Sequence, residues 1–212
     1  MTQRTQRRRA NRAEKREANR ARILRAARMV FGARGFHAAT IEEIADEAGL
    51  SNGAVYYNFE NKEDLFLALL DEWRAELVHN VESTFSTGTS DAPQEQLQNE
   101  LRQIVQTFSP SREWRLLLLE FVAYAARNPK FRARFVAGRR QFKAALTNAL
   151  KARIATLGVT PSLPPEHLAL LLTALVNGLS VDELTEPGTV PGELLGQAAS
   201  ALLESRSPGP RH

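Results

Sequence analysis

The sequence predicts an all-α protein of about nine helices, in which an N-terminal helix-turn-helix precedes a larger helical region. Three observations lead to this prediction. Apolar residues recur at helical spacing in almost every segment, and no segment shows the alternation typical of a strand. Glycine, proline and short polar runs separate these segments. Near the N-terminus, residues 40–62 carry the signals of two short helices joined by a tight turn.

The composition is that of an ordinary globular protein. The 212 residues allow one large or two small domains, with 43% hydrophobic and 25% charged residues. The absence of cysteine excludes disulfides, zinc–thiolate sites and thiol catalysis. No apolar run approaches the roughly 20 residues that span a bilayer, and no apolar core follows the basic N-terminus as in a secretory signal. We therefore expect a cytoplasmic protein with no membrane partner.

The formal net charge of +4 conceals a segregation of charge along the chain. Residues 1–36 carry twelve basic and two acidic side chains, so their net charge is +10 and that of the remaining residues is −6. A basic end on an acidic body suits contact with a polyanion at one end only. We expect residues 1–15 to form a disordered basic arm that can order in a DNA minor groove, and we count Arg16 and Arg20 among the DNA contacts.

The first helix is expected from about Arg16 to Ala33, and its role is structural. Gly35 ends this helix, and Phe36 returns the chain to the core. One face of the helix is apolar and consists of Ile23, Ala27, Val30 and Phe31.

Residues 40–62 contain the capping signals of the two short helices. Thr40 can cap the first helix, and Glu43 completes a capping box with it. Gly49 follows where a helix needs a left-handed residue to end, and Ser51 can cap the second helix.

Three spaced residues provide the scaffold of a helix-turn-helix. The two helices cross steeply, so a small residue is needed at the crossing, and Ala45 supplies it. Gly49 lies where the chain reverses, and Val55 points back to close the small core.

Beyond this motif every segment again predicts a helix. Asn61 can cap a long helix from Lys62 to about Phe85, which could connect two domains mechanically. Further helices are expected at residues 95–108, 111–127, 130–157, 166–184 and 192–204. The predicted divisions are a basic arm at 1–15, a helix-turn-helix domain at 16–62, an effector-binding and dimerisation domain at 63–204, and a disordered tail at 205–212.

A dense pattern of spaced residues runs through the motif: Thr40-x3-Ile44-Ala45-x2-Ala48-Gly49-Leu50-Ser51-x-Gly53-x2-Tyr56-x2-Phe59-x2-Lys62. Over about fifty residues, from Ile23 to Trp73, the chain resembles the DNA-binding domain of TetR-family transcriptional regulators. The rest resembles that family only in its helical content and length. The resemblance implies a homodimer that pairs through its last two long helices and binds a palindromic DNA operator. It also implies repression that an unidentified small-molecule effector relieves.

The resemblance assigns phosphate contacts to Thr40, Tyr56 and Lys62. Asn58 stands where the family often has histidine, so its own phosphate contact stays open. The start and outer face of the second helix would approach base edges or the nearby backbone. These DNA-contact positions are Ser51, Asn52, Gly53, Ala54 and Tyr57.

The reading edge of the second helix offers few hydrogen-bonding groups. Asn52 could bind adenine through two hydrogen bonds, whereas Ala54 offers only a methyl contact, for example to thymine. We therefore expect part of the sequence discrimination to come from DNA shape and from the basic arm.

Aromatic side chains of the middle helices could line an apolar effector chamber, although aromatic residues at helical spacing more often form plain core. Glu120 needs a partner because a carboxylate in an apolar helix is costly. We expect Arg139 or Arg140, with a cationic ligand as the alternative. Asn177 could be a polar group of the pocket or a hydrogen-bonding group at the dimer interface. The pocket candidates are Phe108, Trp114, Leu117, Glu120, Phe121, Tyr124, Phe142 and Asn177.

The last two long helices are rich in leucine and carry small residues that would allow another helix to approach closely. A four-helix interface between two copies would cover them, and the alternative is that both cap their own core. The interface candidates are Leu171, Ala174, Leu175, Gly178, Leu195, Ala198, Ala199 and Leu202.

An enzyme is not expected. The four histidines do not have metal-ligand spacing, and no phosphate loop, nucleophile elbow or H-E-x-x-H sequence is present. We therefore assign no catalytic residue, no metal and no cofactor. The alternative to a ligand-responsive repressor is an effector-independent architectural DNA-binding protein, which predicts a body without a cavity.

Overall fold

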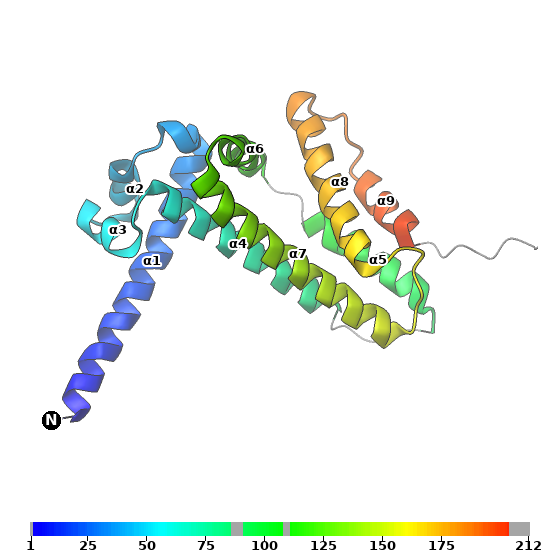
Figure 1. The fold of residues 1–212 in the computed structure, drawn as a ribbon, viewed down its shortest axis with the longest axis horizontal. Coiled ribbons are helices and arrows are strands. Elements are labelled where there is room, and N and C mark those ends of the chain that lie inside the picture. The colour runs from blue at the N-terminus through cyan, green and yellow to red at the C-terminus, as the bar shows by residue number, and fades with distance from the viewer. Residues whose placement is uncertain (1, 86–90, 108–110, 204–212) are drawn as a thin grey trace, which may run out of the picture. The chain divides into compact units, whose positions relative to one another are not determined.

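A computed structural model describes residues 2–85, 91–107 and 111–203, and within these ranges the chain forms helices and no strand (Figure 1). The predicted all-α fold is confirmed. The predicted helix at residues 62–85 has the predicted bounds, and the other boundaries, except the start of the first helix, differ by a few residues. The helices are α1 (Thr2–Ala38), α2 (Ile41–Ala48), α3 (Asn52–Asn58), α4 (Lys62–Phe85), α5 (Pro93–Thr107), α6 (Arg112–Arg127), α7 (Pro129–Leu157), α8 (Pro165–Thr185) and α9 (Leu194–Leu203).

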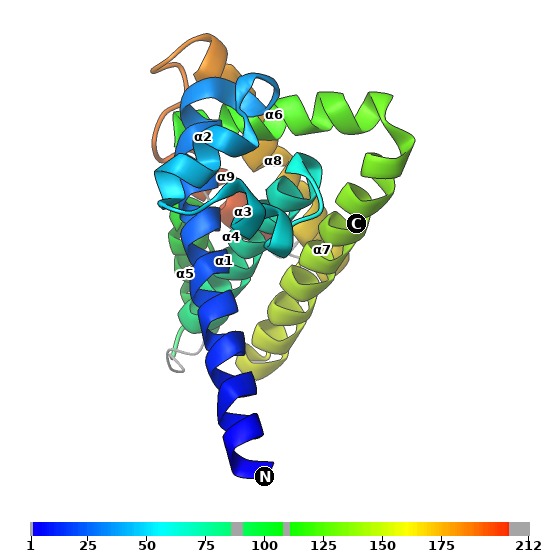
Figure 2. The same cartoon turned by 90° about the vertical axis from the view of Figure 1, so that its left-hand side faces the viewer.

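The first helix differs from the expectation at its beginning. The sequence predicts a disordered arm at residues 1–15, but α1 begins at Thr2 and its first turns extend past α2 and α3 (Figures 1 and 2). The reason is local: residues 2–20 contain neither glycine nor proline, and alanine, arginine, glutamine, lysine and glutamate favour helix. At Gly35 the backbone leaves the helix with φ 75° and ψ 169°, and Phe36 is buried.

The described residues form two compact units. Unit 1 comprises the described residues within 1–72 and 116–135. Unit 2 comprises those within 73–115 and 136–212. The divisions therefore fall inside α4, α6 and α7, whereas the sequence places one border between residues 62 and 63. The predicted tail at 205–212 lies outside the described residues.

The core of unit 1 explains why residues 116–135 belong to it. The ring centroid of Phe36 lies 5.8 Å from that of Phe31 and 5.2 Å from that of Phe121. Phe66 packs edge-on against Phe31, and Phe131 stacks on Phe121. Each buried aromatic ring removes a large apolar area from water, so α6 and α7 complete a core that the short helices alone would leave open.

The core of unit 2 combines an apolar cluster with a buried ion pair. Leu77, Leu101 and Leu150 are among its buried side chains. Arg153 and Glu100 are also buried, and Nε of Arg153 donates to Oε2 of Glu100 at 2.8 Å. A buried ion pair adds little net stability but is costly to break. It therefore fixes α5 against α7.

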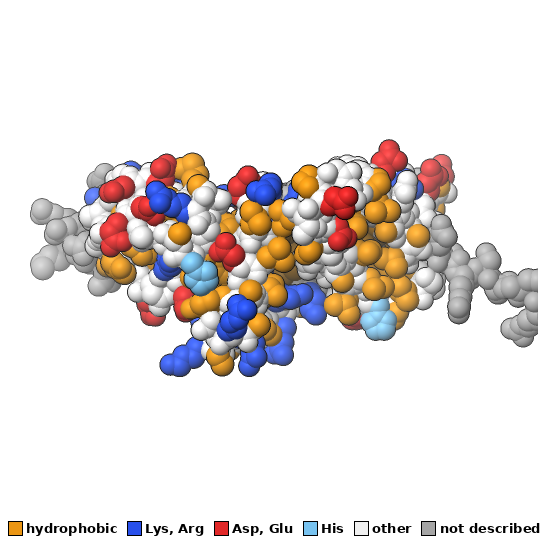
Figure 3. Space-filling view, turned by 90° about the horizontal axis from the view of Figure 1, so that it is seen from above, with side chains coloured by type: hydrophobic (Ala, Val, Ile, Leu, Met, Phe, Trp, Pro, Cys, Tyr) orange, Lys and Arg blue, Asp and Glu red, His pale blue; other side chains and the backbone are white. Residues whose placement is uncertain are grey.

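Helix α8 has an exposed apolar face, which is visible in Figure 3. By length and composition alone it would suit a membrane-spanning helix, contrary to the expectation that no apolar run is long enough, and 17% of that stretch is buried. Leu170, Leu171 and Val181 are exposed on it. An exposed face of this kind needs a partner to cover it.

Candidate nucleic-acid interface

Both short helices begin with the predicted side-chain caps. Oγ1 of Thr40 accepts the backbone N–H of Glu43 at 3.2 Å, and the Glu43 carboxylate accepts the N–H of Thr40 at 3.1 Å. Oγ of Ser51 accepts the N–H of Ala54 at 3.3 Å. These bonds satisfy backbone donors that a helix start leaves open, and so they fix where α2 and α3 begin.

The scaffold residues lie inside the motif, and an arginine from α1 completes it. Ala45 and Val55 are fully buried, and Gly49 ends α2 in the left-handed conformation with φ 60° and ψ 42°. The guanidinium of Arg22 donates to the carbonyl of Ala48 at 2.6 Å. Sequence reasoning missed Arg22, and no local signal marks it because its partner lies 26 positions away.

Helix α3 presents an exposed edge. Asn52 and Gly53 in its first turn are exposed, while Ala54 is half-buried. The side chains of Tyr56 and Tyr57 are 53% and 72% exposed. Large aromatic side chains are seldom so exposed without a function, so this edge is available to a partner.

Two arginines of α1 lie beside α3. The guanidinium carbon of Arg16 lies 5.6 Å from the ring centroid of Tyr57, and that of Arg20 lies 4.7 Å from the ring of Phe59. Cation–π contacts at such distances orient the positive groups. The structure therefore places Arg16 beside the exposed edge of α3 and Arg20 beside the residue that ends this helix.

Lys62 joins the far end of the motif to its beginning. Its Nζ donates to the carbonyl of Ala39 at 2.8 Å and to that of His37 at 3.1 Å, and it lies 4.8 Å from the ring centroid of Phe36. Partial burial lowers the pKa of Lys62 from its usual value. The ammonium has three donors, so the bonds to two carbonyls leave it able to reach an anion next to Thr40.

Asn58 turns back on its own helix. Its Nδ2 donates to the carbonyl of Ala54 at 2.7 Å, while its Oδ1 is buried without a hydrogen-bond partner. One of the two N–H groups of the Asn58 amide is therefore used within its own helix, and the other remains for a further acceptor.

Glu120 has a different partner from the one that the sequence predicts. Its Oε2 accepts the backbone N–H of Phe36 at 2.7 Å, whereas the expected partners Arg139 and Arg140 are exposed on α7. The break at Gly35 explains the correction, because it removes the Phe36 N–H from the helical hydrogen-bonding pattern. Glu120 thus caps the end of α1.

Three further pocket candidates lie in the core of unit 1 instead of around a cavity. Leu117 is buried, and Phe121 stacks on Phe66. The hydroxyl of Tyr124 donates to the carboxylate of Glu63, and this hydrogen bond raises the pKa of Tyr124. These residues fasten α6 to the start of α4.

The remaining pocket candidates are dispersed. Trp114 is buried in unit 2 with its ring 5.3 Å from that of Trp73, and Phe142 packs against the core of the same unit. Asn177 is exposed on α8, and Phe108 lies outside the described residues.

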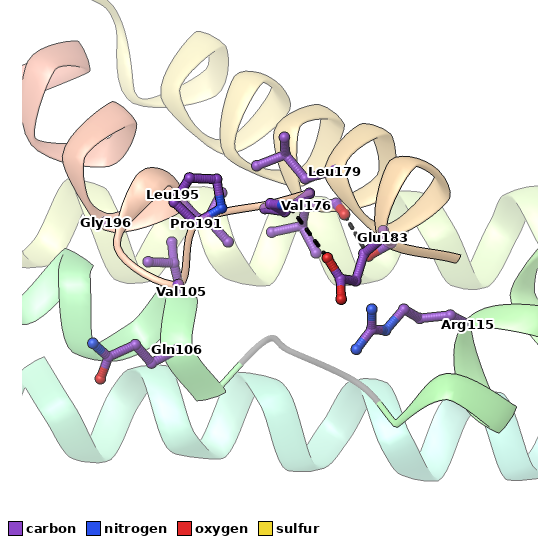
Figure 4. Close-up of a pocket in the computed structure, with 12 residues that line it drawn as sticks. Val105, Gln106, Arg115, Val176, Leu179, Glu183, Pro191, Leu195 and Gly196 are labelled. Carbon is purple, nitrogen blue, oxygen red and sulfur yellow. Dashed lines mark hydrogen bonds between the residues drawn. The ribbon is translucent and has the colours of Figure 1, made fainter. Parts of the chain in front are cut away.

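Unit 2 has a pocket at a place that the sequence did not indicate. Its volume is about 310 Å³, and α5, the first turn of α6, α8, the α8–α9 connection and the start of α9 line it (Figure 4). Of the described residues predicted for a ligand or an interface, only Leu195 lines it. No single segment reveals this pocket because each contributes only a few side chains. Its polar side chains are Gln106, Arg115, Ser180 and Glu183.

The dimer-interface candidates divide into two groups. Leu171, Ala174 and Gly178 lie on the exposed face of α8, and nothing lies within 4 Å of the place where a Cβ of Gly178 would be. Ala199 is fully buried, because α9 packs on α5 of its own chain. Leu175, Leu195, Ala198 and Leu202 are half-buried.

Comparisons with known proteins cover both parts of the chain. Residues 23–69 match the family model described as bacterial regulatory proteins, tetR family. Residues 93–207 match that of the BetI-type transcriptional repressor, C-terminal.

Relatives with curated functions are regulators. The transcriptional repressor AcnR of Corynebacterium efficiens is 27% identical over 163 residues, which span 75% of this chain and 78% of AcnR. The transcriptional activator FasR of Mycolicibacterium smegmatis is 42% identical over 72 residues, or 34% of this chain and 33% of FasR.

Solved structures share the fold. A TetR-family regulator from Mesorhizobium loti superposes with a TM-score of 0.70 at 20% identity, covering 89% of this chain and 94% of the other. FadR of Bacillus subtilis, solved in complex with stearoyl-CoA, superposes with a TM-score of 0.65 at 17% identity, covering 86% and 96%.

Proposed function

Because this chain belongs to the TetR family of transcriptional regulators, with a BetI-type C-terminal domain, we propose that it is a ligand-responsive repressor that binds a palindromic operator as a homodimer. Repression is proposed because the relative that matches most of the chain, AcnR, is a repressor. The proposal rests chiefly on the exposed edge of α3 and the arginines beside it.

The residues of unit 1 divide the work of DNA binding. Thr40, Tyr56 and Lys62 hold phosphates and so set the position of α3 on the duplex. Asn52 and Tyr57 approach base edges in the major groove. Arg16 and Arg20 lie on the same side as Tyr57 and Phe59, where they neutralise further phosphates.

The exposed face of α8 supports a homodimer. A second copy that packs α8 against α8 would cover Leu171, Ala174 and Gly178, and small residues would let the helices approach closely. Two recognition helices fit successive major grooves when they are about 34 to 36 Å apart, so a symmetric dimer requires a palindrome with that spacing.

The pocket in unit 2 supports an effector, whereas an architectural DNA-binding protein needs no cavity. Helices α4 and α6 each contribute residues to both units. A ligand that prefers a differently spaced dimer would therefore shift the population away from DNA, by no more than its difference in affinity for the two states.

The test is selection of bound DNA from a randomised duplex library, followed by affinity measurements on the recovered palindrome. The double variant Tyr56→Ala with Lys62→Ala is expected to weaken binding at least about tenfold, since both phosphate contacts are lost. Glu82→Gln on the exposed side of α4 serves as the control. A protein that stays monomeric at micromolar concentration, with unchanged affinity in the double variant, would contradict the proposal.

A further inference from the structure

The pocket of unit 2 is polarised, and its α8 wall accepts hydrogen bonds. Ser180 and Glu183 lie three positions apart and line the same pocket. The hydroxyl of Ser180 donates to the carbonyl of Val176 at 2.6 Å, so only its oxygen lone pairs remain for a ligand. The carboxylate of Glu183 accepts the N–H groups of Gly188 at 3.0 Å and of Val190 at 3.3 Å. This wall therefore suits a cationic group.

The facing wall donates hydrogen bonds. Arg115 extends from the first turn of α6 toward the carboxylate of Glu183 (Figure 4). A guanidinium carries donors only and matches a carboxylate in geometry. The two backbone N–H groups, and then the charge of Arg115, lower the pKa of Glu183. The carboxylate of Glu183 therefore stays ionised at neutral pH.

Apart from the amide of Gln106, the rest of the lining is apolar, and the space is small. Val105, Leu179 and Leu195 contribute aliphatic surface, and the volume is about 310 Å³. Ligand pockets span roughly 300 to 1,000 Å³, so this pocket suits a small molecule with one apolar group.

The two opposite charges decide between classes of ligand. A ligand with only a negative charge would be attracted by Arg115 but repelled by Glu183. A ligand with only a positive charge would be attracted by Glu183 but repelled by Arg115. A molecule with both charges can satisfy both walls at once. We propose that this pocket binds a small zwitterion with an apolar group, its anionic group on Arg115 and its cationic group on Glu183 and Ser180. The inference rests on the proposed function, because it names the class of effector.

The test uses three charge forms of the same molecules on the full chain. Calorimetry compares L-leucine and L-phenylalanine with their methyl esters, which carry only the cation, and with their N-acetyl derivatives, which carry only the anion. We expect at least one zwitterion to bind at least about tenfold more tightly than both of its singly charged forms.

Two charge-neutralising variants assign the walls. Arg115→Gln is expected to lose about tenfold for the zwitterion and to favour the ester over the N-acetyl form. Glu183→Gln keeps an oxygen for the two N–H groups of the connection and is expected to show the opposite preference. A misfolded protein would not show this exchange of preference. Arg112→Gln and Glu186→Gln, both exposed and outside the lining, are the controls.

DNA binding is measured on the same preparations with the selected palindrome. If the protein binds DNA but binds no probe at millimolar concentration, or binds a singly charged form as tightly as the zwitterion, the inference is overturned. If the preparations do not bind DNA, the proposed function fails instead, whatever the probes show.

Discussion

At the scale of single residues, Gly35 connects the end of α1 to Glu120. Its backbone, with φ 75° and ψ 169°, lies in a region that residues with a side chain rarely adopt. A Cβ at this position would lie 2.7 Å from Oε1 of Glu120. Glycine is therefore required for two reasons: the backbone conformation, and the close approach of the carboxylate that binds the Phe36 N–H.

Gly35→Ala is expected to lower the free energy of unfolding by about 3 kcal/mol, because strain adds to the displacement of Glu120. Gly158→Ala is the matched control: its φ is 63° but nothing lies within 4 Å, so strain alone should cost about 1 kcal/mol. Urea denaturation measures both. Equal losses in the two variants would show that the contact with Glu120 does not matter.

At the scale of elements, Arg22 links α1 to the end of α2. Its guanidinium donates to the carbonyls of Ala48 at 2.6 Å and Gly49 at 3.3 Å, where the helix leaves carbonyl groups open. The bond spans the turn on which the orientation of α3 depends.

Arg22→Ala is expected to destabilise the protein by about 1 kcal/mol, since the bond is charge-assisted but only partly buried. It should also weaken DNA binding by loosening the turn. Arg25→Ala, on an exposed site of the same helix, removes a charge without removing this cap. The idea fails if the two variants unfold at the same denaturant concentration.

The arginines of α1 should also affect how strongly DNA affinity depends on salt concentration. Removal of Arg16 and Arg20 together should reduce the slope of log affinity against log salt concentration by about one for each arginine in each protomer. Fluorescence anisotropy on the selected palindrome measures this slope. Arg139→Ala, exposed in unit 2, should leave the slope unchanged. An unaltered slope in the double variant would remove these arginines from the interface.

At the scale of the whole molecule, the exposed face of α8 is the surface that we propose for pairing with a second copy. Leu171 is 38% exposed on the face that also holds Ala174 and Gly178. Buried area alone does not set affinity, but a charge at the centre of an apolar interface is strongly unfavourable.

Leu171→Glu is therefore expected to raise the dimer dissociation constant about tenfold or more. Sedimentation velocity over a concentration series measures the change. Leu119→Glu places the same charge on an exposed leucine of α6 and should leave the dimer intact. The α8 interface is excluded if both variants sediment like the unaltered protein.

The domain division shows where prediction from sequence stops. The sequence assigns residues 116–135 to the effector-binding domain, because they lie within residues 63–204. In the structure they pack with the DNA-binding helices of unit 1. Hydrophobic periodicity shows that Leu117 and Phe121 face a core, but it does not say which core. For the same reason, the sequence groups the effector candidates around one chamber. In the structure, four of them lie in unit 1.

The nine helices of the described residues and the helix-turn-helix follow from local sequence, because caps, glycine turns and apolar spacing act within a few residues of one another. Thr40, Gly49 and Ser51 are local signals of this kind. Three contacts depend on the folded chain: Glu120 accepts the N–H of Phe36, Arg22 binds the carbonyl of Ala48 at the end of α2, and Arg115 faces Glu183 across a pocket. These pairs lie far apart in the chain, and helix packing, which periodicity leaves open, brings them together.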